Sequence, residues 1–382
     1  MKRLTDHAAY RSDYQRALTG IRGVAALWVL LYHAWVYSTP RLIQFDLAGF
    51  HVDLTPLFST GFVGVDLFFV LSAYLLGARY FRWVEGRAER PDLRNYFLRR
   101  VKRIYPAYLA QLVLLLLIAA TTTLYALPGI KSLLAHLIFY FRLPPVWVTQ
   151  LNGVWWTLPT EFYFYLLLPP LVLLLRGPAS RWFILVIMAA AIAYRYWVFV
   201  HFHDLGVSWM SPLMGNTLGY LDGFCLGLLA SWLSVKLENR TFSPRLLDGL
   251  FIVGCAGILL SIWTLAWVYP EYWDGHPVLF FRNLMIAGSS CVLVMATRHG
   301  SRLARGMFAN QAIFFCGVIS YSLYLWHLPV IRALSKTTFL TEYTGYALGI
   351  YLLLATPVAL FLAWLSYRFV ELPFLHKPRS PG

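Results

Sequence analysis

Charged side chains are scarce in this chain of 382 residues, and acidic ones especially so. Asp, Glu, Lys and Arg make up 13% of the residues, whereas hydrophobic residues make up 59%. Soluble domains carry about 25% charged residues, so the composition excludes an ordinary soluble protein and predicts an integral membrane protein. The net charge of +15 would suggest nucleic-acid binding in a soluble chain. Because cytoplasmic loops of membrane proteins collect Lys and Arg, we expect no nucleic-acid partner.

Cysteine is scarce too, and its placement does not fit a metal site. Each cysteine lies inside an apolar run, well separated from the others and without metal-ligand spacing. Small buried hydrophobic side chains are the simpler interpretation, and we expect no bound metal. We also expect no cleavable signal peptide, because no small-residue cleavage site follows the first apolar run. The four cysteines are Cys225, Cys255, Cys291 and Cys316.

Long apolar runs dominate the rest of the chain. A bilayer core of roughly 30 Å needs about 20 apolar residues in a helix. Ten runs fit, covering residues 21–39, 60–81, 104–126, 155–175, 182–200, 214–235, 248–268, 278–297, 312–332 and 345–369. The run at 132–141 is too short to span, so we expect an interfacial or re-entrant helix there that Pro144 and Pro145 end. We predict an all-α polytopic transmembrane helix bundle of about ten spans, with residues 1–382 as one domain.

The basic residues predict the orientation of this bundle. With the N-terminus in the cytoplasm, 25 of the 32 Lys and Arg fall in cytoplasmic segments and five in outer loops. The opposite orientation would reverse that ratio, so the positive-inside rule favours both termini inside. Residues 1–20 are then a cytoplasmic N-terminal segment, and residues 370–382 are a cytoplasmic tail.

Ionisable side chains inside a span are costly, so each is a functional-site hypothesis. We interpret Asp66 and Asp222 as helix-pairing or gating groups rather than as parts of a site. The ionisable residues of the predicted spans that we consider further are Arg22, His33, Asp66, Glu161, Arg195, Asp222, Arg282 and His327.

The first span carries two of them on one face. Arg22 and His33 are eleven residues apart, close to three helical turns, with a rise of roughly 16 Å between them. Arg22 is then near the cytoplasmic mouth, and His33 is at or beyond the middle of the membrane. An imidazole can take a proton from a hydroxyl near neutral pH. The alternative for His33 is a polar contact between helices.

A carboxylate and aromatic side chains occur together in the fourth span. Glu161 lies in its outer third, where it could orient His33, take a proton or bind a sugar hydroxyl. Trp156 and Tyr165 are candidates to line an acceptor site, although aromatic residues also form interfacial belts. His327, near the outer end of the ninth span, is a further candidate for contact with an acceptor. A structural hydrogen bond is the alternative for Glu161 and His327.

A third candidate element is the basic segment RNYFLRRVKRIYP, residues 94–106. Arg100 and Arg103 are three residues apart and share a helix face. Paired guanidinium groups bind phosphates bidentately. The alternative is a basic flank that touches lipid phosphate.

Several stretches together resemble the acyltransferase-3 family of multipass membrane acyltransferases, which modify carbohydrates, lipids or natural products. They occur in family order: RALTGIRGVAALWVLLYH (16–33), GVDLFFVLSAYLLG (64–77), RNYFLRRVKRIYPAY (94–108), WWTLPTEFYFYLLLP (155–169), ISYSLYLWHLP (319–329) and SYRFVELPF (366–374). The chain differs from the usual family residues at Thr19, Ala73 and Pro159.

The resemblance implies roles for the candidate residues. His33 is the general base, Glu161 assists it, and Arg22, Arg100 and Arg103 meet the acyl-CoA donor. Acetyl is the commonest acyl group in the family, and an envelope polysaccharide or its lipid-linked precursor is the commonest kind of acceptor.

We therefore expect a multipass enzyme of the cytoplasmic membrane that transfers an acyl group from cytoplasmic acyl-CoA to a hydroxyl of a carbohydrate-type acceptor. No Ser or Cys stands in a nucleophile motif, so direct transfer is favoured over an acyl-enzyme. Because the chain ends at Gly382, we expect a stand-alone protein without the soluble esterase-like domain of some relatives. The alternative function is a transporter or flippase for a glycan or lipid, in which the same polar groups line the path.

Overall fold

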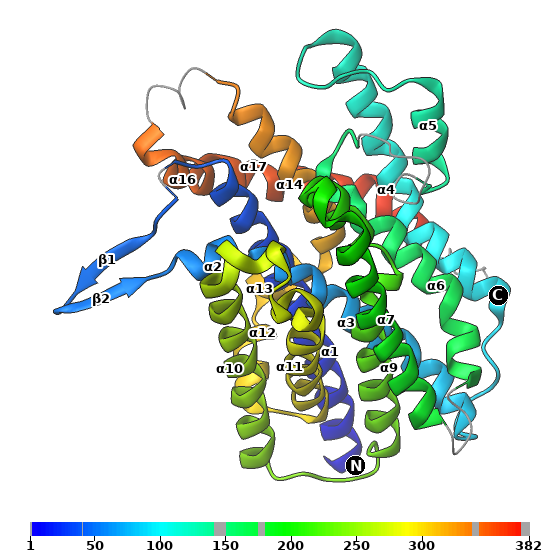
Figure 1. Ribbon diagram of the computed structural model, residues 1–382. Helices are drawn as coiled ribbons and strands as arrows, with labels where there is room; N and C mark the ends of the chain where they lie inside the picture. Colours follow the sequence, from blue (N-terminus) through cyan, green and yellow to red (C-terminus); the bar gives the residue numbers. More distant parts are fainter. Residues whose placement is uncertain (1, 40, 141–149, 175–179, 338–343, 376–382) are drawn as a thin grey trace. The chain divides into compact units, whose positions relative to one another are not determined.

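The computed structural model describes residues 2–39, 41–140, 150–174, 180–337 and 344–375 (Figure 1). The described chain forms two compact units. Unit 1 contains Met1–Tyr32, Leu42–Arg90 and Thr160–Val318, and unit 2 contains His33–Arg41, Pro91–Pro159 and Ile319–Gly382. The prediction that residues 1–382 form one domain stays a prediction.

Unit 1 is built mainly of long helices that pack side by side: α3 on α9, α9 on α11, and α11 on α10 (Figure 1). Its elements are most of α1 (Lys2–Val36), β1 (Gln44–Leu47), β2 (Phe50–Asp53), α2 (Thr55–Ser59), η1 (Gly61–Val63), α3 (Gly64–Val84), most of α6 (Thr157–Leu174), α7 (Ser180–Phe202), η3 (His203–Leu205), α8 (Val207–Met214), η4 (Leu218–Tyr220), α9 (Leu221–Lys236), α10 (Pro244–Val268), η5 (Tyr269–Asp274), α11 (Pro277–His299), α12 (Arg302–Phe308) and α13 (Gln311–Val318).

Unit 2 packs α14 against α17, and α4 against the C-terminal helices. Its elements are the end of α1, α4 (Leu93–Thr121), α5 (Ile130–Leu137), η2 (Gly153–Trp156), the start of α6, α14 (Ser320–Leu334), η6 (Thr344–Tyr346), α16 (Ala347–Ile350), the π-helical η7 (Tyr351–Ala355), α17 (Thr356–Ser366), the π-helical η8 (Tyr367–Glu371) and α18 (Leu372–Leu375).

The predicted all-α polytopic bundle is confirmed. Within the described residues, nine helical segments are long and apolar enough to cross a membrane, and the bent pair of consecutive helices α13 and α14 makes a tenth if it counts as one span. Each segment overlaps one predicted run. The nine are Tyr14–Val36, Gly61–Val84, Leu93–Thr121, Gly153–Leu174, Trp182–Leu205, Leu218–Lys236, Pro244–Asp274, Pro277–His299 and Ala347–Leu375.

The boundaries differ most where a basic segment precedes an apolar one. Residues 94–106, predicted as a basic segment with a helix face before the third span, are the first turns of α4 itself. The helix starts there because the Asp92 carboxylate accepts a hydrogen bond from the Arg94 N–H at 3.0 Å, which caps the first turn. In the same way α1 starts at Lys2, well before the predicted span at 21–39. Helices do not have to begin where the apolar run begins.

Two further elements lie between the spans. The short helix predicted at 132–141 is observed as α5, whereas Pro144 and Pro145 lie outside the described residues. The hairpin β1–β2 was not foreseen from the sequence. Its register pairs Phe45 with Val52 and Leu47 with Phe50, which gives the ribbon one apolar face. Its other face pairs Gln44 with Asp53 and His51 with Asp46.

Small residues allow the first helix to pack closely in unit 1. A Cβ atom on Gly20 would lie 1.9 Å from the Phe308 carbonyl oxygen, and one on Gly317 would lie 2.0 Å from the Thr19 carbonyl oxygen. Only glycine permits such backbone contacts. The contacts place α1 directly against the α12–α13 segment.

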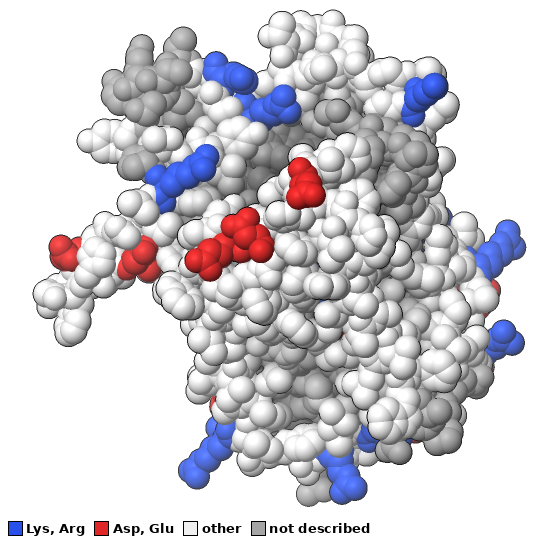
Figure 2. All heavy atoms as spheres, in the orientation of Figure 1, with Lys and Arg blue, Asp and Glu red and all other residues white. Residues whose placement is uncertain are grey.

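The outer faces of the helices are apolar, as lipid contact requires. Trp182, Leu260 and Trp267 are 62%, 68% and 84% exposed. Figure 2 shows that most of the visible described surface carries no charged side chain. The four cysteines are free thiols, and three of them are buried, in agreement with their interpretation as small hydrophobic residues. The inside location of both termini stays a prediction.

Candidate active site

Two predicted site residues, 294 positions apart in the sequence, lie in direct contact in unit 2. His33, in the last turn of α1, has its Nδ1 atom 3.1 Å from Nε2 of His327 on α14. The ring centroids are 4.9 Å apart. His327 is completely buried, and His33 is half-buried. The contact between α1 and α14 is apolar next to the pair, where Ala34 and Ile331 share one buried cluster.

The hydrogen bonds of His327 determine which nitrogen of His33 carries a lone pair. Nδ1 of His327 lies 3.0 Å from the Leu323 carbonyl oxygen. A carbonyl only accepts, so Nδ1 must carry the proton and donate it. In a neutral ring Nε2 of His327 then accepts, and the donor to it must be Nδ1–H of His33. The lone pair of neutral His33 is therefore on Nε2, where it can take a proton from a substrate hydroxyl.

A buried amide network holds the part of α14 that carries His327. Pro329 lies inside this helix and lacks an N–H, so the Leu325 carbonyl, four residues earlier, loses its usual helical donor. The side-chain amides of Gln111 and Asn152 donate to this carbonyl at 2.7 and 2.9 Å. Trp155 donates to the Gln111 side-chain oxygen at 2.8 Å. The Leu325 carbonyl that the proline leaves without a helical donor is thereby paired.

Glu161 forms a second polar cluster, in unit 1. Ser72 donates to its Oε1 atom at 2.6 Å, and the hydroxyl of Tyr165 donates to the same oxygen. Among the described residues, no hydrogen bond reaches its Oε2 atom. Glu161 is half-buried, so Oε2 can accept from a ligand hydroxyl. Glu161 and Tyr165, both predicted site residues, thus lie in one cluster. Trp156, another predicted site residue, is half-buried in η2.

The predicted phosphate-binding arginines have different surroundings. Arg103 donates to Glu371 at 3.2 Å, and its guanidinium lies over the ring of Tyr321. The Glu371 side chain is 2% exposed and also accepts from Ser322. Arg103 therefore neutralises a buried carboxylate at the end of the last span. Arg100 lies one turn earlier on α4. A phosphate-binding role for both residues stays a prediction.

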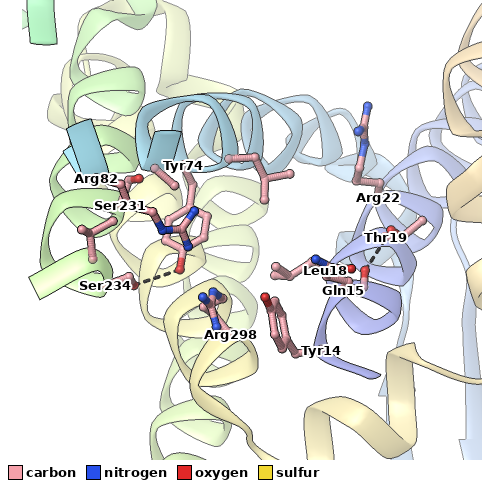
Figure 3. A pocket seen from close by; sticks show the side chains of 13 residues that line it. Tyr14, Gln15, Leu18, Thr19, Arg22, Tyr74, Arg82, Ser231, Ser234 and Arg298 are labelled. Atoms are coloured by element: carbon pink, nitrogen blue, oxygen red, sulfur yellow. Dashed lines mark hydrogen bonds between the residues drawn. The ribbon is translucent and has the colours of Figure 1, made fainter. Parts of the chain in front are cut away.

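Arg22, the third predicted donor-binding residue, faces a pocket in unit 1 (Figure 3). The pocket has a volume of about 390 Å³ and is bordered by α1, α3, α9 and α11. Arg82 and Arg298 line it together with Arg22. In the sequence both are ordinary basic residues at the ends of predicted spans. Each ends a different predicted span, and the sequence does not show which span ends are neighbours.

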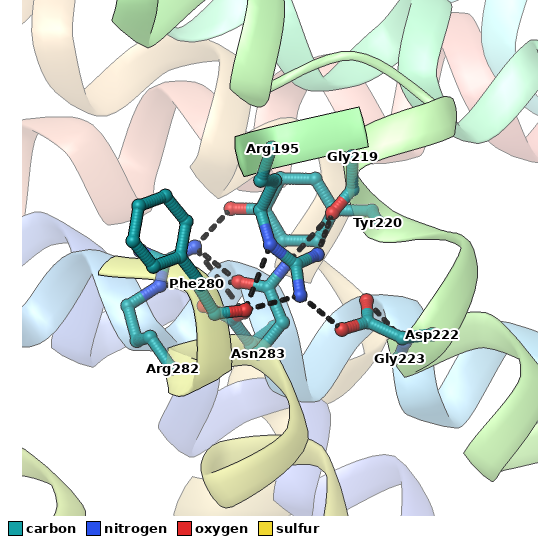
Figure 4. A network of polar contacts seen from close by, with 9 residues as sticks. Arg195, Gly219, Tyr220, Asp222, Gly223, Phe280, Arg282 and Asn283 are labelled. Atoms are coloured by element: carbon teal, nitrogen blue, oxygen red, sulfur yellow. Dashed lines mark hydrogen bonds and ion pairs between the residues drawn. The ribbon is translucent and has the colours of Figure 1, made fainter. Parts of the chain in front are cut away.

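The remaining ionisable residues of the spans form a buried network in unit 1 (Figure 4). Arg195 on α7 donates to Asp222 on α9 at 2.6 Å, and their side chains are 2% and 0% exposed. Arg195 also donates to the carbonyls of Gly219 and Phe280. These contacts tie α7, α9 and α11 together, which confirms the helix-pairing interpretation of Asp222.

Arg282 continues this network. It donates to the Tyr220 hydroxyl at 2.8 Å and to the Asn283 side chain at 2.7 Å, and it lies 3.7 Å from the Asp66 carboxylate. Asp66 therefore links α3 to α11. Within the described residues, no group of three His, Cys, Asp or Glu side chains is placed to hold a metal ion, and operation without a metal stays a prediction.

Comparisons with known proteins show the family of the chain. The profile of the acyltransferase domain family, acyltransferase-3, matches residues 15–368. O-acetyltransferase OatA of Staphylococcus aureus strain NCTC 8325 is 26% identical over 96% of this chain and 58% of its own length. A putative O-acetyltransferase of S. aureus strain MSSA476 is 24% identical over 94% of this chain and 57% of its own length.

The chain thus spans less than two thirds of the length of these relatives. No solved structure matches it. The family match covers almost every described helix, including those that carry His33, Glu161 and His327. The chain therefore belongs to the acyltransferase-3 family of multipass membrane acyltransferases.

Proposed function

We propose that this protein is an O-acetyltransferase of the cytoplasmic membrane, which moves an acetyl group from cytoplasmic acetyl-CoA to a hydroxyl of a carbohydrate-type acceptor. The contact between His33 and His327 is the observation that carries the proposal. A general base needs a lone pair in a defined direction, and this pair supplies one at Nε2 of His33. A transporter path does not require a fixed imidazole tautomer, so the pair favours the enzyme over the transporter.

The proposed step is a direct acyl transfer. Nε2 of His33 takes the proton of the acceptor hydroxyl while the hydroxyl oxygen attacks the thioester carbonyl carbon. The C–O bond forms and the C–S bond breaks. The CoA thiolate then takes the proton back from His33, so that the products are the acetyl ester and CoA with a free thiol. His327 acts as a positioning residue because it meets the substrate only through His33.

Glu161 is proposed to bind the acceptor. Its Oε1 atom is occupied by Ser72 and Tyr165, and its Oε2 atom is left to accept a hydroxyl. Two hydroxyl donors fix the orientation of the carboxylate, and hydrogen bonds to carboxylates are among the strong ones. Trp156 is proposed to add the aromatic surface on which a sugar ring packs.

The test is incubation of the purified full chain in lipid nanodiscs with radiolabelled acetyl-CoA and candidate polysaccharide or glycolipid acceptors. We expect label on the acceptor with wild-type protein and none with His33→Ala. Binding of acetyl-CoA by His33→Ala, measured by calorimetry, should stay within about twofold of wild type, because a base contributes to the chemical step rather than to donor binding. Undiminished transfer by His33→Ala would refute the proposed mechanism.

A matched control is Trp35→Phe, two residues further along α1, which changes an exposed hydrogen bond to Arg41 and not the histidine pair. This variant should transfer acetyl groups at the wild-type rate. The transporter alternative is tested with the same protein in proteoliposomes. If no acceptor is acetylated while a labelled glycan or lipid crosses the proteoliposome membrane, the protein is a transporter and not an acetyltransferase.

A further inference from the structure

The pocket that contains Arg22 lies where three helices end beside the middle of α1, on one predicted side of the membrane. Tyr14, Thr19 and Arg22 come from the middle of α1, and Arg82 and Arg298 come from the last turns of α3 and α11. The last turns of α9 complete the wall. With the N-terminus inside, the start of the first span and the ends of the second, sixth and eighth spans are all cytoplasmic. The pocket is therefore open to a cytoplasmic ligand.

The described residues that line the pocket include three arginines and no acidic side chain. Two of these arginines share one carboxylate outside the lining: Arg82 donates to Glu238 at 2.8 and 3.2 Å, and Arg298 donates to it at 3.1 Å. The Arg298 guanidinium also lies over the ring of Tyr14, 4.1 Å from its centroid. Glu238 thus orients two of the three guanidinium groups. Its single negative charge leaves the three arginines with a net positive charge.

A buried hydroxyl in the wall is a second, independent sign of a ligand. Ser231 has no exposed surface, and its Oγ atom has no hydrogen-bond partner among the described residues. Buried polar groups are almost always paired, so such a group needs an explanation. Figure 3 shows Ser231 beside Arg82 and Tyr74 in the pocket wall. An oxygen of a bound anion would supply the missing partner.

Stabilisation of helix ends alone does not account for these features. Basic residues in the last turn of a helix interact well with its dipole, and Arg82 and Arg298 are so placed. That interaction needs neither an enclosed volume nor a buried hydroxyl without a partner. The volume of about 390 Å³ is within the range of small-ligand sites. Guanidinium groups recognise phosphate bidentately, and Tyr14, Leu18 and Leu75 add apolar surface.

We propose that this pocket binds a phosphate-bearing nucleotide through Arg22, Arg82, Arg298 and Ser231. On the function proposed above, on which this inference rests, the ligand is the nucleotide half of acetyl-CoA. The assignment moves the main phosphate contacts of the donor away from Arg103, which is already paired with Glu371.

The test is calorimetric titration of the full chain, in phosphatidylcholine nanodiscs, with adenosine 3′,5′-bisphosphate. This probe carries phosphates on a nucleoside but has no thiol to react. We expect Arg298→Gln to weaken binding about 10- to 100-fold, because a charge-assisted contact is lost. Ser231→Ala should weaken it about 3- to 10-fold, through one hydrogen bond. Ala78→Met, which fills the pocket without changing its charge, should also abolish most of the binding.

The control is Arg240→Gln, an exposed arginine that does not line the pocket, and its affinity should stay within about twofold of wild type. Thermal unfolding of each variant verifies the fold, and Ser231→Ala serves if Arg298→Gln does not fold. Wild-type affinity in both Ala78→Met and Ser231→Ala would overturn the proposal.

A phosphate could also come from an anionic lipid headgroup, and a second arm separates the two sources. Nanodiscs of phosphatidylglycerol should leave bisphosphate affinity nearly unchanged if the site is for a nucleotide. If bisphosphate does not bind while variant-sensitive binding of phosphatidylglycerol is found, the nucleotide assignment is overturned.

The outcome for the pocket is separable from that for the enzyme. If the variants do not change bisphosphate binding while acetyl transfer is intact, the nucleotide site is refuted and the proposed function stands. If the variants weaken bisphosphate binding but no acceptor is acetylated by wild type, the nucleotide site stands and the proposed function is refuted.

Discussion

Alanine replacements of His327 and of His33 should lower kcat by different amounts, because the two histidines have different proposed roles. His33 is proposed to move the proton, and His327 only holds the tautomer and direction of the His33 ring. A general base contributes about 100- to 10,000-fold to the rate. A neutral hydrogen bond contributes about 0.5–1.5 kcal/mol, which corresponds to about 2- to 13-fold. We therefore expect His327→Ala to lower kcat about tenfold and His33→Ala to lower it at least about 100-fold.

The assay is acetyl transfer at saturating acetyl-CoA and acceptor, so that kcat is read separately from KM. His327→Gln is the conservative variant, since its amide oxygen can accept from Nδ1–H of His33. It should recover most of the lost rate. Because the alanine replacement also leaves a cavity in a fully buried site, the loss of packing needs its own control.

The control for the loss of packing is Ile331→Ala. Ile331 lies one turn further along α14 and is completely buried. It should lower thermal stability by a similar amount to His327→Ala, about 2–5 kcal/mol, with little change in kcat. A loss of 100-fold or more in folded His327→Ala, or no loss at all, would refute the assignment of roles within the pair.

Three further predictions test the surroundings of the site. Glu161→Gln should raise the KM for the acceptor about 10-fold or more and leave the KM for acetyl-CoA unchanged, because a charge-assisted hydrogen bond to the acceptor is lost; equal changes in both KM values would contradict the assignment. Gln111→Leu should lower stability by about 1–3 kcal/mol, because it leaves the buried Leu325 carbonyl with fewer donors. The added change Pro329→Ala restores a helical N–H for that carbonyl, so the double variant should melt above Gln111→Leu; a lower melting temperature would dismiss the network. At the predicted cytoplasmic end of unit 1, the hydrogen bond from Arg82 lowers the pKa of Glu238. A group whose pKa is lowered on folding stabilises the folded state at pH values above its unfolded pKa, and this stabilisation is lost as the pH falls through the folded pKa. The stability advantage of wild type over Glu238→Gln should therefore be present at pH 7 and decrease as the pH falls below about 4; a constant difference across this range would contradict the ion pair.

Local patterns in the sequence were enough to predict the helices. Composition and run length located the nine membrane-spanning segments of the described residues and the bent pair α13–α14, since each depends only on about 20 consecutive residues. The spacing of Arg22 and His33 placed both on α1 for the same reason. The sequence does not predict the break at Ile319 between α13 and α14, because one apolar run at 312–332 continues through it.

The partners within the site could not be found in this way, because they are far apart in the chain. His33 and His327 are separated by 294 positions, and Arg103 and Glu371 by 268. Gln111 is a neutral residue in an apolar run, so nothing in its surroundings in the sequence marks it as the donor to Leu325. Arg82 and Arg298 resemble any basic flank, and only the packing of α3 and α11 brings them to one pocket.

The hydrogen bond from His327 to the Leu323 carbonyl makes the histidine pair a closed end for protons. A proton accepted by His33 can be shared with His327, but it can go no further, because the next group is a peptide carbonyl that does not take up protons. On the proposed mechanism the proton must therefore leave through His33 itself, to the departing thiolate. Each acetyl transfer would then deliver the proton of the acceptor hydroxyl to the CoA thiol, and none would pass beyond His327 along α14.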